Sequence, residues 1–231
     1  MITGRLIGIG VGPGDPELIT IKAMKAIRSA PVIAYTSSKG RPSYARQIVA
    51  EHIAAAAKEI KITLPMHPSP EITQSAFDEG ASRISAELEI GRNVAVLCEG
   101  DPMIFGSFGP VLERLQQQYP TEIIAGVSIS MAAAAASLQP LLLDRESLSI
   151  LPATLPEKEL AIRLRTTDCA VIQKLGGHME KLRLVLSDLN LAERALYIEH
   201  ACDVGERVEP FTKLGDVDPP DFSTILVLKN R

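Results

Sequence analysis

Short apolar runs alternate with longer segments of helical period along the first half of the chain. The apolar runs predict strands at residues 5–11, 32–35, 60–64 and 93–98. Helices are expected after Asp15, which precedes Pro16, and after Ser43, because both are good N-cap residues. A longer helix is expected over residues 71–90, ending at Gly91. Strands that alternate with helices in this way are typical of a parallel sheet covered by helices.

The regular alternation of strands and helices ends after residues 116–120. This polar stretch ends in proline and is the best linker candidate. A strand at 122–125 leads into a small-residue helix at 128–137. Further strands are predicted at 148–151, 170–174, 195–199, 207–211 and 223–228. We therefore predict an α/β protein of two domains with a ligand cleft between them. The first, 1–119, has a mostly parallel sheet, and the second, 120–231, has a mixed sheet.

Composition narrows the class of protein. Hydrophobic residues make up 46% of the 231 residues and charged ones 23%, as in packed globular proteins. The net charge of −4 argues against general nucleic-acid binding. No apolar run approaches the roughly 18–20 residues of a membrane span, and the first residues lack a signal-peptide layout. We expect a cytoplasmic protein with no nucleic-acid or membrane partner.

Cysteine and histidine spacing gives no sign of a metal site. The three cysteines are odd in number and far apart, which fits free thiols rather than a disulfide framework. No pair of histidines has a metal-binding spacing. The residues concerned are Cys98, Cys169, Cys202, His52, His67, His178 and His200.

Two loops carry the strongest functional signal. Residues 10–15, Gly-Val-Gly-Pro-Gly-Asp, and residues 98–105, Cys-Glu-Gly-Asp-Pro-Met-Ile-Phe, each follow a buried-looking strand and precede a helix. Open α/β sheets bind ligands at the carboxyl ends of their strands, so the two loops predict one ligand site. A nicotinamide-dependent oxidoreductase is an alternative, but residues 34–37 after the second strand lack the acidic residue of that fingerprint.

Three segments resemble the motifs of the tetrapyrrole methylases, which use S-adenosylmethionine (SAM) and lie outside the Rossmann class. These segments are 10–23, 99–106 and 125–128. Within that family, residues 33–35, 43–46, 64–66, 97–102 and 174–176 look most like the precorrin-2 C20-methyltransferases of cobalamin synthesis. Gly177 stands where that branch is expected to carry arginine.

The resemblance implies an enzyme that uses SAM to methylate C20 of precorrin-2, giving precorrin-3A, or C20 of cobalt-factor II. It also implies a homodimer. Methylation of another ring position and a non-catalytic SAM-binding module stay open as alternatives. The SAM contacts implied are Pro13, Glu99, Gly100, Asp101, Ile104, Ser128, Ile129, Leu175, Ala201 and Thr224.

The acceptor carries acetate and propionate groups, so an acidic protein must place basic side chains beside it. Candidates for these contacts are Lys39, Arg41, Arg46, Arg145, Lys174 and His178. Arg46 is the first choice because arginine can bind a carboxylate bidentately. We assign no catalytic base. Thr36 stands where uroporphyrinogen methylases carry an aspartate with that role, and an enamine-like meso carbon is already nucleophilic.

Overall fold

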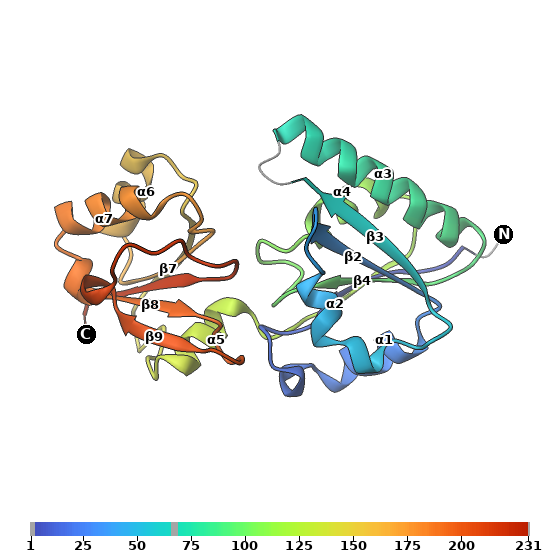
Figure 1. Cartoon of the computed structure of the whole chain (residues 1–231), viewed down its shortest axis with the longest axis horizontal. Coiled ribbons are helices and arrows are strands. Elements are labelled where there is room, and N and C mark those ends of the chain that lie inside the picture. The colour runs from blue at the N-terminus through green and yellow to red at the C-terminus, as the bar shows by residue number, and fades with distance from the viewer. Residues whose placement is uncertain (1–2, 66–68, 231) are drawn as a thin grey trace. The chain divides into compact units, whose positions relative to one another are not determined.

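The computed structural model describes residues 3–65 and 69–230, so Met66 of the motif at 64–66 and His67 lie outside the described residues. The chain divides into two compact units, Met1–Ser128 and Ile129–Arg231 (Figure 1). Each unit contains one sheet with helices packed against it. This arrangement confirms the predicted α/β class.

The first sheet has the order β3-β2-β4-β1-β5 among the described residues, and every neighbouring pair is parallel. Its strands are β1 (Leu6–Gly10), β2 (Val32–Ser38), β3 (Lys58–Leu64), β4 (Val94–Cys98) and β5 (Thr121–Ile124). The helices of this unit are α1 (Ile21–Ser29), α2 (Tyr44–Ile48), α3 (Pro70–Glu89) and α4 (Phe108–Leu115).

The first sheet is buried on both faces. Val96 of β4 joins the core under α3 and α4, with Ile84 and Phe108. Its neighbour Leu97 faces the other side and packs with Ile27 of α1. Alternate residues of a strand point to opposite faces, so the central strands must be apolar throughout. That requirement explains why these strands read as continuous apolar runs.

The second sheet has the order β6-β7-β10-β8-β9 within the described part of the chain. The β6–β7 pair is parallel and the other neighbouring pairs are antiparallel, which confirms the predicted mixed sheet. The strands are β6 (Leu148–Pro152), β7 (Cys169–Gln173), β8 (Ala195–Glu199), β9 (Arg207–Pro210) and β10 (Thr224–Leu228). The helices are α5 (Ile129–Ala136), α6 (Glu157–Arg165) and α7 (Met179–Asp188).

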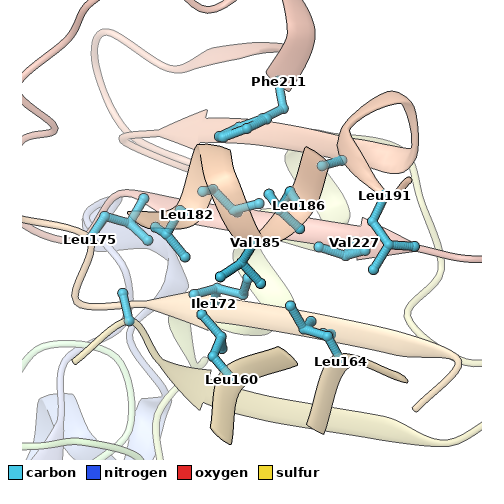
Figure 2. Close-up of a cluster of buried hydrophobic side chains, with 14 of the residues drawn as sticks. Leu160, Leu164, Ile172, Leu175, Leu182, Val185, Leu186, Leu191, Phe211 and Val227 are labelled. Carbon is cyan, nitrogen blue, oxygen red and sulfur yellow. The ribbon is translucent and has the colours of Figure 1, made fainter. Parts of the chain in front are cut away.

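Helices cover both faces of this second sheet. Figure 2 shows Leu160 and Leu164 of α6 and Val185 of α7 around Ile172 of β7. On the other face, Ala133 of α5 packs in a separate cluster with sheet residues. The short alanine side chains let α5 lie close to the strands.

Several local predictions are confirmed. Ser43 caps α2, because its Oγ accepts a hydrogen bond from the Arg46 N–H at 3.4 Å. The long helix α3 ends at Glu89, and Gly91, just after the C-cap Ile90, has a φ of 81° that only glycine adopts readily. Asp15 caps the turn that follows it, with its Oδ1 accepting from the Glu17 N–H at 2.8 Å.

Other expectations were wrong. The segment after Asp15 forms only a short 3-10 helix, Pro16–Leu18, and α1 begins afresh with Thr20 as its cap. Strand β5, expected to open the second domain, pairs with β1 from Leu6↔Thr121 onward and completes the first sheet. The division between the units therefore falls after Ser128 and not after residue 119. Helices α6 and α7 are absent from the elements that the pattern predicts.

No helix within residues 3–65 and 69–230 is long and apolar enough to cross a membrane.

Candidate functional site

Three loops meet at one edge of the first sheet. They follow β1, β4 and β5, which are adjacent and parallel, so their carboxyl ends lie side by side. The loops are residues 11–15, 99–107 and 125–128, the three segments that sequence analysis singled out. Strand order thus brings together motifs that are distant in the sequence.

The first two loops are joined by backbone hydrogen bonds. Gly12 and Gly100 form an antiparallel bridge, in which Gly100 N–H donates to the Gly12 carbonyl at 2.8 Å and Gly12 N–H donates back at 3.3 Å. Val11 N–H donates to the Cys98 carbonyl at 2.9 Å. Gly12 has a φ of 84° and Gly100 a φ of 63°, the left-handed region where glycine pays no steric penalty. The bridge therefore depends on glycine at both positions.

The third loop packs directly on the other two. A Cβ atom on Gly126 would lie 2.2 Å from the Gly100 carbonyl oxygen and 2.8 Å from the Gly10 Cα. A Cβ on Gly10 would lie 2.6 Å from that same oxygen. Backbone atoms cannot rotate away as a side chain can, so these contacts leave no room for any larger residue. We call Gly10, Gly100 and Gly126 the glycine junction.

Asp101 fastens the second loop to the third. Its Oδ1 accepts a hydrogen bond from Met103 N–H at 2.9 Å, and its Oδ2 accepts one from Gly126 N–H at 3.0 Å. Sequence analysis gave Asp101 as a cofactor contact. The structure adds a positioning role, because the carboxylate holds two loops in register. A carboxylate has further lone pairs, so it can still accept from a ligand.

Glu99 connects the same loop to a different part of the unit. Its Oε1 accepts a hydrogen bond from Ala45 N–H, at the start of α2, at 3.1 Å. The segment just before α2 carries the basic residues Lys39 and Arg41, both of which are exposed. The carboxylate thus ties the second loop to the basic segment that follows β2.

The other first-unit cofactor candidates also lie in these loops. Pro13 is buried in the first loop, Ile104 is half-buried in the second, and Ser128 is buried in the third. Ile129 follows Ser128 directly and opens α5, the first element of the second unit.

In the second unit, Leu175, Ala201 and Thr224 lie at one edge of the second sheet. Leu175 follows the carboxyl end of β7, and Ala201 follows that of β8. Thr224 opens the antiparallel strand β10 between them and is in register with Ile198. All three are buried. The structure therefore brings together the predicted second-unit residues as one set.

The backbone at this edge is unusually strained. Lys174, His200 and Phe222 have φ values of 59°, 47° and 69°, in the left-handed region. Non-glycine residues adopt that region at a cost, and such residues concentrate at functional sites. Each immediately follows or shortly precedes a strand end at the same edge. The edge therefore has a second feature typical of a binding site.

Arg46 forms an ion pair with a carboxylate of β3. Its Nε and Nη2 donate to the two carboxylate oxygens of Glu59 at 3.1 and 3.0 Å. Glu59 is the second residue of β3, far along the strand from the end that leads toward the site. Hydrogen bonding to Arg46 lowers the pKa of Glu59, so the pair stays charged at neutral pH. This ion pair occupies one edge of the guanidinium, so a substrate carboxylate would have to bind the remaining N–H groups or displace Glu59.

The remaining basic candidates keep exposed or half-exposed positions. Lys174 is exposed at the strained edge of the second sheet. His178 is half-buried at the start of α7, where burial and the nearby Lys181 lower its pKa. Arg145 is almost fully exposed, 4.0 Å from Asp144. His178 is therefore mostly neutral at pH 7 and would act as a hydrogen-bonding group rather than as a fixed charge.

The thiol beside the three loops is held in its neutral form. Burial raises the pKa of Cys98 to about 12, so its side chain stays a neutral thiol. Among the described residues, no group of three histidine, cysteine, aspartate or glutamate side chains could hold a metal ion. Thr36 at the end of β2 is half-buried and carries no carboxylate.

Sequence analysis missed two features of this site. It did not identify Gly10 and Gly126 as packing positions, because their contacts link three segments far apart in the chain. It also gave no role to Met103 and Phe105, two large apolar residues of the second loop that are 57% and 44% exposed. The only sequence signal for them was their place within the second motif.

Comparison with known proteins identifies the family of this chain. Residues 5–218 match the sequence model of the Tetrapyrrole (Corrin/Porphyrin) Methylases. A precorrin-2 C(20)-methyltransferase from a Sinorhizobium species is 34% identical over 97% of this chain and 95% of that protein. The cobalt-precorrin-2 C(20)-methyltransferase of Salmonella typhimurium is 32% identical over 99% of this chain and 98% of that protein.

The fold also matches a solved structure of this kind. A uroporphyrin-III C-methyl transferase from Thermus thermophilus, complexed with S-adenyl homocysteine, has a TM-score of 0.69. It is 22% identical in sequence, and the match covers 98% of this chain and 92% of that one. The match of the family model over most of the chain shows that this protein belongs to the tetrapyrrole methylase family.

Proposed function

We propose that this chain is a SAM-dependent methyltransferase that methylates C20 of precorrin-2, giving precorrin-3A, or C20 of cobalt-factor II. Membership of the tetrapyrrole methylase family supports the reaction class. The names of the two full-length relatives, at 34% and 32% identity, support the C20 position. The glycine junction is the structural observation that carries the proposal, because it leaves rigid backbone at the edge where a ligand would bind.

The three loops suit the donor. SAM needs hydrogen-bond donors and acceptors for its nucleoside, an acceptor for its ammonium group and apolar walls beside its sulfonium. In the proposed site, the backbone at Gly100 and the Asp101 carboxylate offer polar groups, and Pro13 and Ile104 offer apolar ones. Ser128 and Ile129 continue this set, and Leu175, Ala201 and Thr224 contribute from the second unit.

The proposed methyl transfer needs no dedicated acid or base group. When bound, SAM supplies an electrophilic methyl group: the acceptor carbon forms a bond to that methyl as the bond from carbon to sulfur breaks. The leaving group is a neutral thioether, and the proton on C20 then departs to water. Alignment of donor and acceptor at about 3–3.5 Å supplies most of the acceleration in such a displacement. The protein's part is to hold both ligands still.

Basic side chains would hold the acceptor by its carboxylates. We propose Lys39 and Arg41 from the first unit, and Lys174 and His178 from the second. Arg46 is proposed after these candidates, because its Nε and Nη2 already bind Glu59.

The test is mass spectrometry of the product after incubation with SAM and either precorrin-2 or cobalt-factor II. We expect the mass gain of one methyl group, with fragmentation that places it at C20, on one of the two acceptors. A methyl at another ring carbon would correct the position. No methyl transfer to either acceptor would contradict the proposal, and calorimetry with SAM and with NAD would then show which cofactor, if any, is bound.

A variant of Glu99 tests whether the second loop also positions the basic segment that would bind the tetrapyrrole. Glu99→Ala removes the acceptor for Ala45 N–H and should loosen the basic segment before α2. We expect the KM for the tetrapyrrole to rise roughly tenfold, the scale of one hydrogen bond to a charged group. The KM for SAM should rise as well, because the resemblance implies that Glu99 also contacts SAM. Glu99→Gln keeps an acceptor oxygen and should stay near the wild-type values. A rise in the SAM KM alone would show that Glu99 has no part in positioning the basic segment.

We also propose that the enzyme is a cytoplasmic homodimer, as the family resemblance implies. Exposed apolar residues that could contribute to an interface gather in one segment of the second unit. They are Met131, Leu138, Leu142 and Leu143.

A further inference from the structure

Two large apolar side chains stand out from the second loop. Met103 is 57% exposed and Phe105 is 44% exposed, whereas Pro102 between Asp101 and Met103 is buried. Single exposed apolar side chains are common on folded proteins, but neighbouring ones beside a ligand site are typical of a binding surface. The loop therefore presents apolar surface beside the glycine junction.

The loop that carries them is held rigidly. Asp101 accepts from Met103 N–H at 2.9 Å through its side chain, and from Ile104 N–H at 3.3 Å through its carbonyl. A Cβ on Gly106 would lie 2.6 Å from the Pro102 carbonyl oxygen, so the far end of the loop is closely packed as well. Met103 and Phe105 thus occupy fixed positions and do not depend on an ordering event.

Phe105 is kept in a costly conformation. Its φ of 52° lies in the left-handed region, where a bulky aromatic residue is rarely found. The surrounding loop must enforce that backbone angle, because the residue alone would avoid it. A strained backbone that presents an aromatic ring is consistent with selection for what the ring contacts.

We propose that Met103 and Phe105 form an apolar platform for one face of the tetrapyrrole macrocycle. This inference rests on the proposed function and names the acceptor-contacting residues of that site. A macrocycle has a broad flat apolar face and a rim of carboxylates. The face would lie on Met103 and Phe105, and the rim would meet the basic segment of Lys39 and Arg41, which Glu99 ties to the same loop. Aromatic and thioether groups both pack well against π-systems.

The test uses variants that remove apolar surface without disturbing the loop. Phe105→Asn is preferred because asparagine tolerates the left-handed region better than other non-glycine residues. Met103→Gln keeps the length of the side chain. The matched control is Ile90→Gln, since Ile90 is 64% exposed and precedes β4 at the opposite edge of the sheet. The probe is the metal-free, two-electron oxidised form of precorrin-2, followed by its visible absorbance and fluorescence.

We expect Phe105→Asn and Met103→Gln each to weaken binding of this probe by roughly five- to tenfold, as for a well-packed contact residue. The Kd for S-adenosylhomocysteine, measured by calorimetry, should stay within about twofold of wild type. The substitutions change only the side chains of residues 103 and 105 and leave the loop backbone in place. The mass of the protein in solution should also be unchanged. Ile90→Gln should behave as wild type in all three measurements.

Three results would overturn the inference. Unchanged probe binding by both Phe105→Asn and Met103→Gln would rule out the platform. An equal loss of S-adenosylhomocysteine affinity would assign these residues to the nucleoside, and a changed mass in solution would assign them to a contact between copies. The proposed function fails separately: a wild-type protein that binds no probe and methylates no tetrapyrrole would overturn both, whereas active wild type with unaffected variants overturns the platform alone.

Discussion

Gly126→Ala is expected to abolish methyl transfer while leaving the second unit folded. The new methyl group would lie 2.2 Å from the Gly100 carbonyl oxygen, so the second and third loops must separate. Overpacking of this kind typically costs about 1–3 kcal/mol, and here the obstacle is backbone rather than a flexible side chain. A displacement of about 1 Å at a site that works by alignment can lower the rate roughly a hundredfold. Steady-state kinetics and denaturant unfolding measure the two effects.

Gly109→Ala is the matched control. Gly109 lies in α4 of the same unit, and a Cβ there would meet nothing within 4 Å. Alanine is a better helix former than glycine, so this variant should be as stable as wild type or more stable, by up to about 1 kcal/mol. Full activity in Gly126→Ala would show that the three loops can separate without consequence, and the glycine junction would lose its proposed role.

Asp101→Ala should cause the second-largest loss. It removes the acceptors for Met103 N–H and Gly126 N–H together. Two hydrogen bonds to a carboxylate are lost, so we expect the free energy of unfolding to fall by about 1–3 kcal/mol. The Kd for SAM should rise at least tenfold, since the loops that would hold it are no longer in register. Asp101→Asn keeps one carbonyl acceptor and should fall between alanine and wild type.

Asp168→Ala separates loss of stability from loss of function. Asp168 makes the same kind of contact in the second unit, where its Oδ2 accepts from Ser147 N–H at 2.8 Å and from Ser147 Oγ at 2.7 Å. It precedes β7, at the opposite edge from the predicted binding residues. This variant should lose stability and keep its SAM affinity. If Asp101→Ala lost only stability in the same way, Asp101 would be a turn-stabilising residue and nothing more.

Much of the first sheet could be predicted from the sequence. Parallel strands that are buried on both faces consist of continuous runs of apolar residues, which are easy to recognise. Strand β4 is the clearest case: every residue from Val94 to Cys98 is buried. The same signal was weak for β5, which lies at an edge of the sheet and pairs, among the described residues, with β1 alone. Its assignment depended on a pairing with residues more than a hundred positions earlier, and no local pattern reports such a pairing.

The candidate site shows the same division between local and long-range information. Motif resemblance located Pro13, Glu99 and Asp101, and the loops that carry them do lie together. It did not reveal that Asp101 binds Gly126, or that Glu99 binds the start of α2, because each contact joins separate segments. The partner of Arg46 was missed for the same reason. Its place on α2 was predictable, whereas its partner Glu59 comes from β3.

The bridge between Gly12 and Gly100 has a consequence for how the protein is made. The ribosome releases Gly12 early, but β1 lies between β4 and β5 in the finished sheet and β4 separates it from β2. During synthesis, the bridge therefore cannot form until β4 has joined the sheet. Gly126 cannot pack against Gly10 and Gly100 until β5 has joined it as well. Contacts so distant in sequence form slowly. The ability to bind a ligand at these loops therefore appears late, once the whole first sheet has formed.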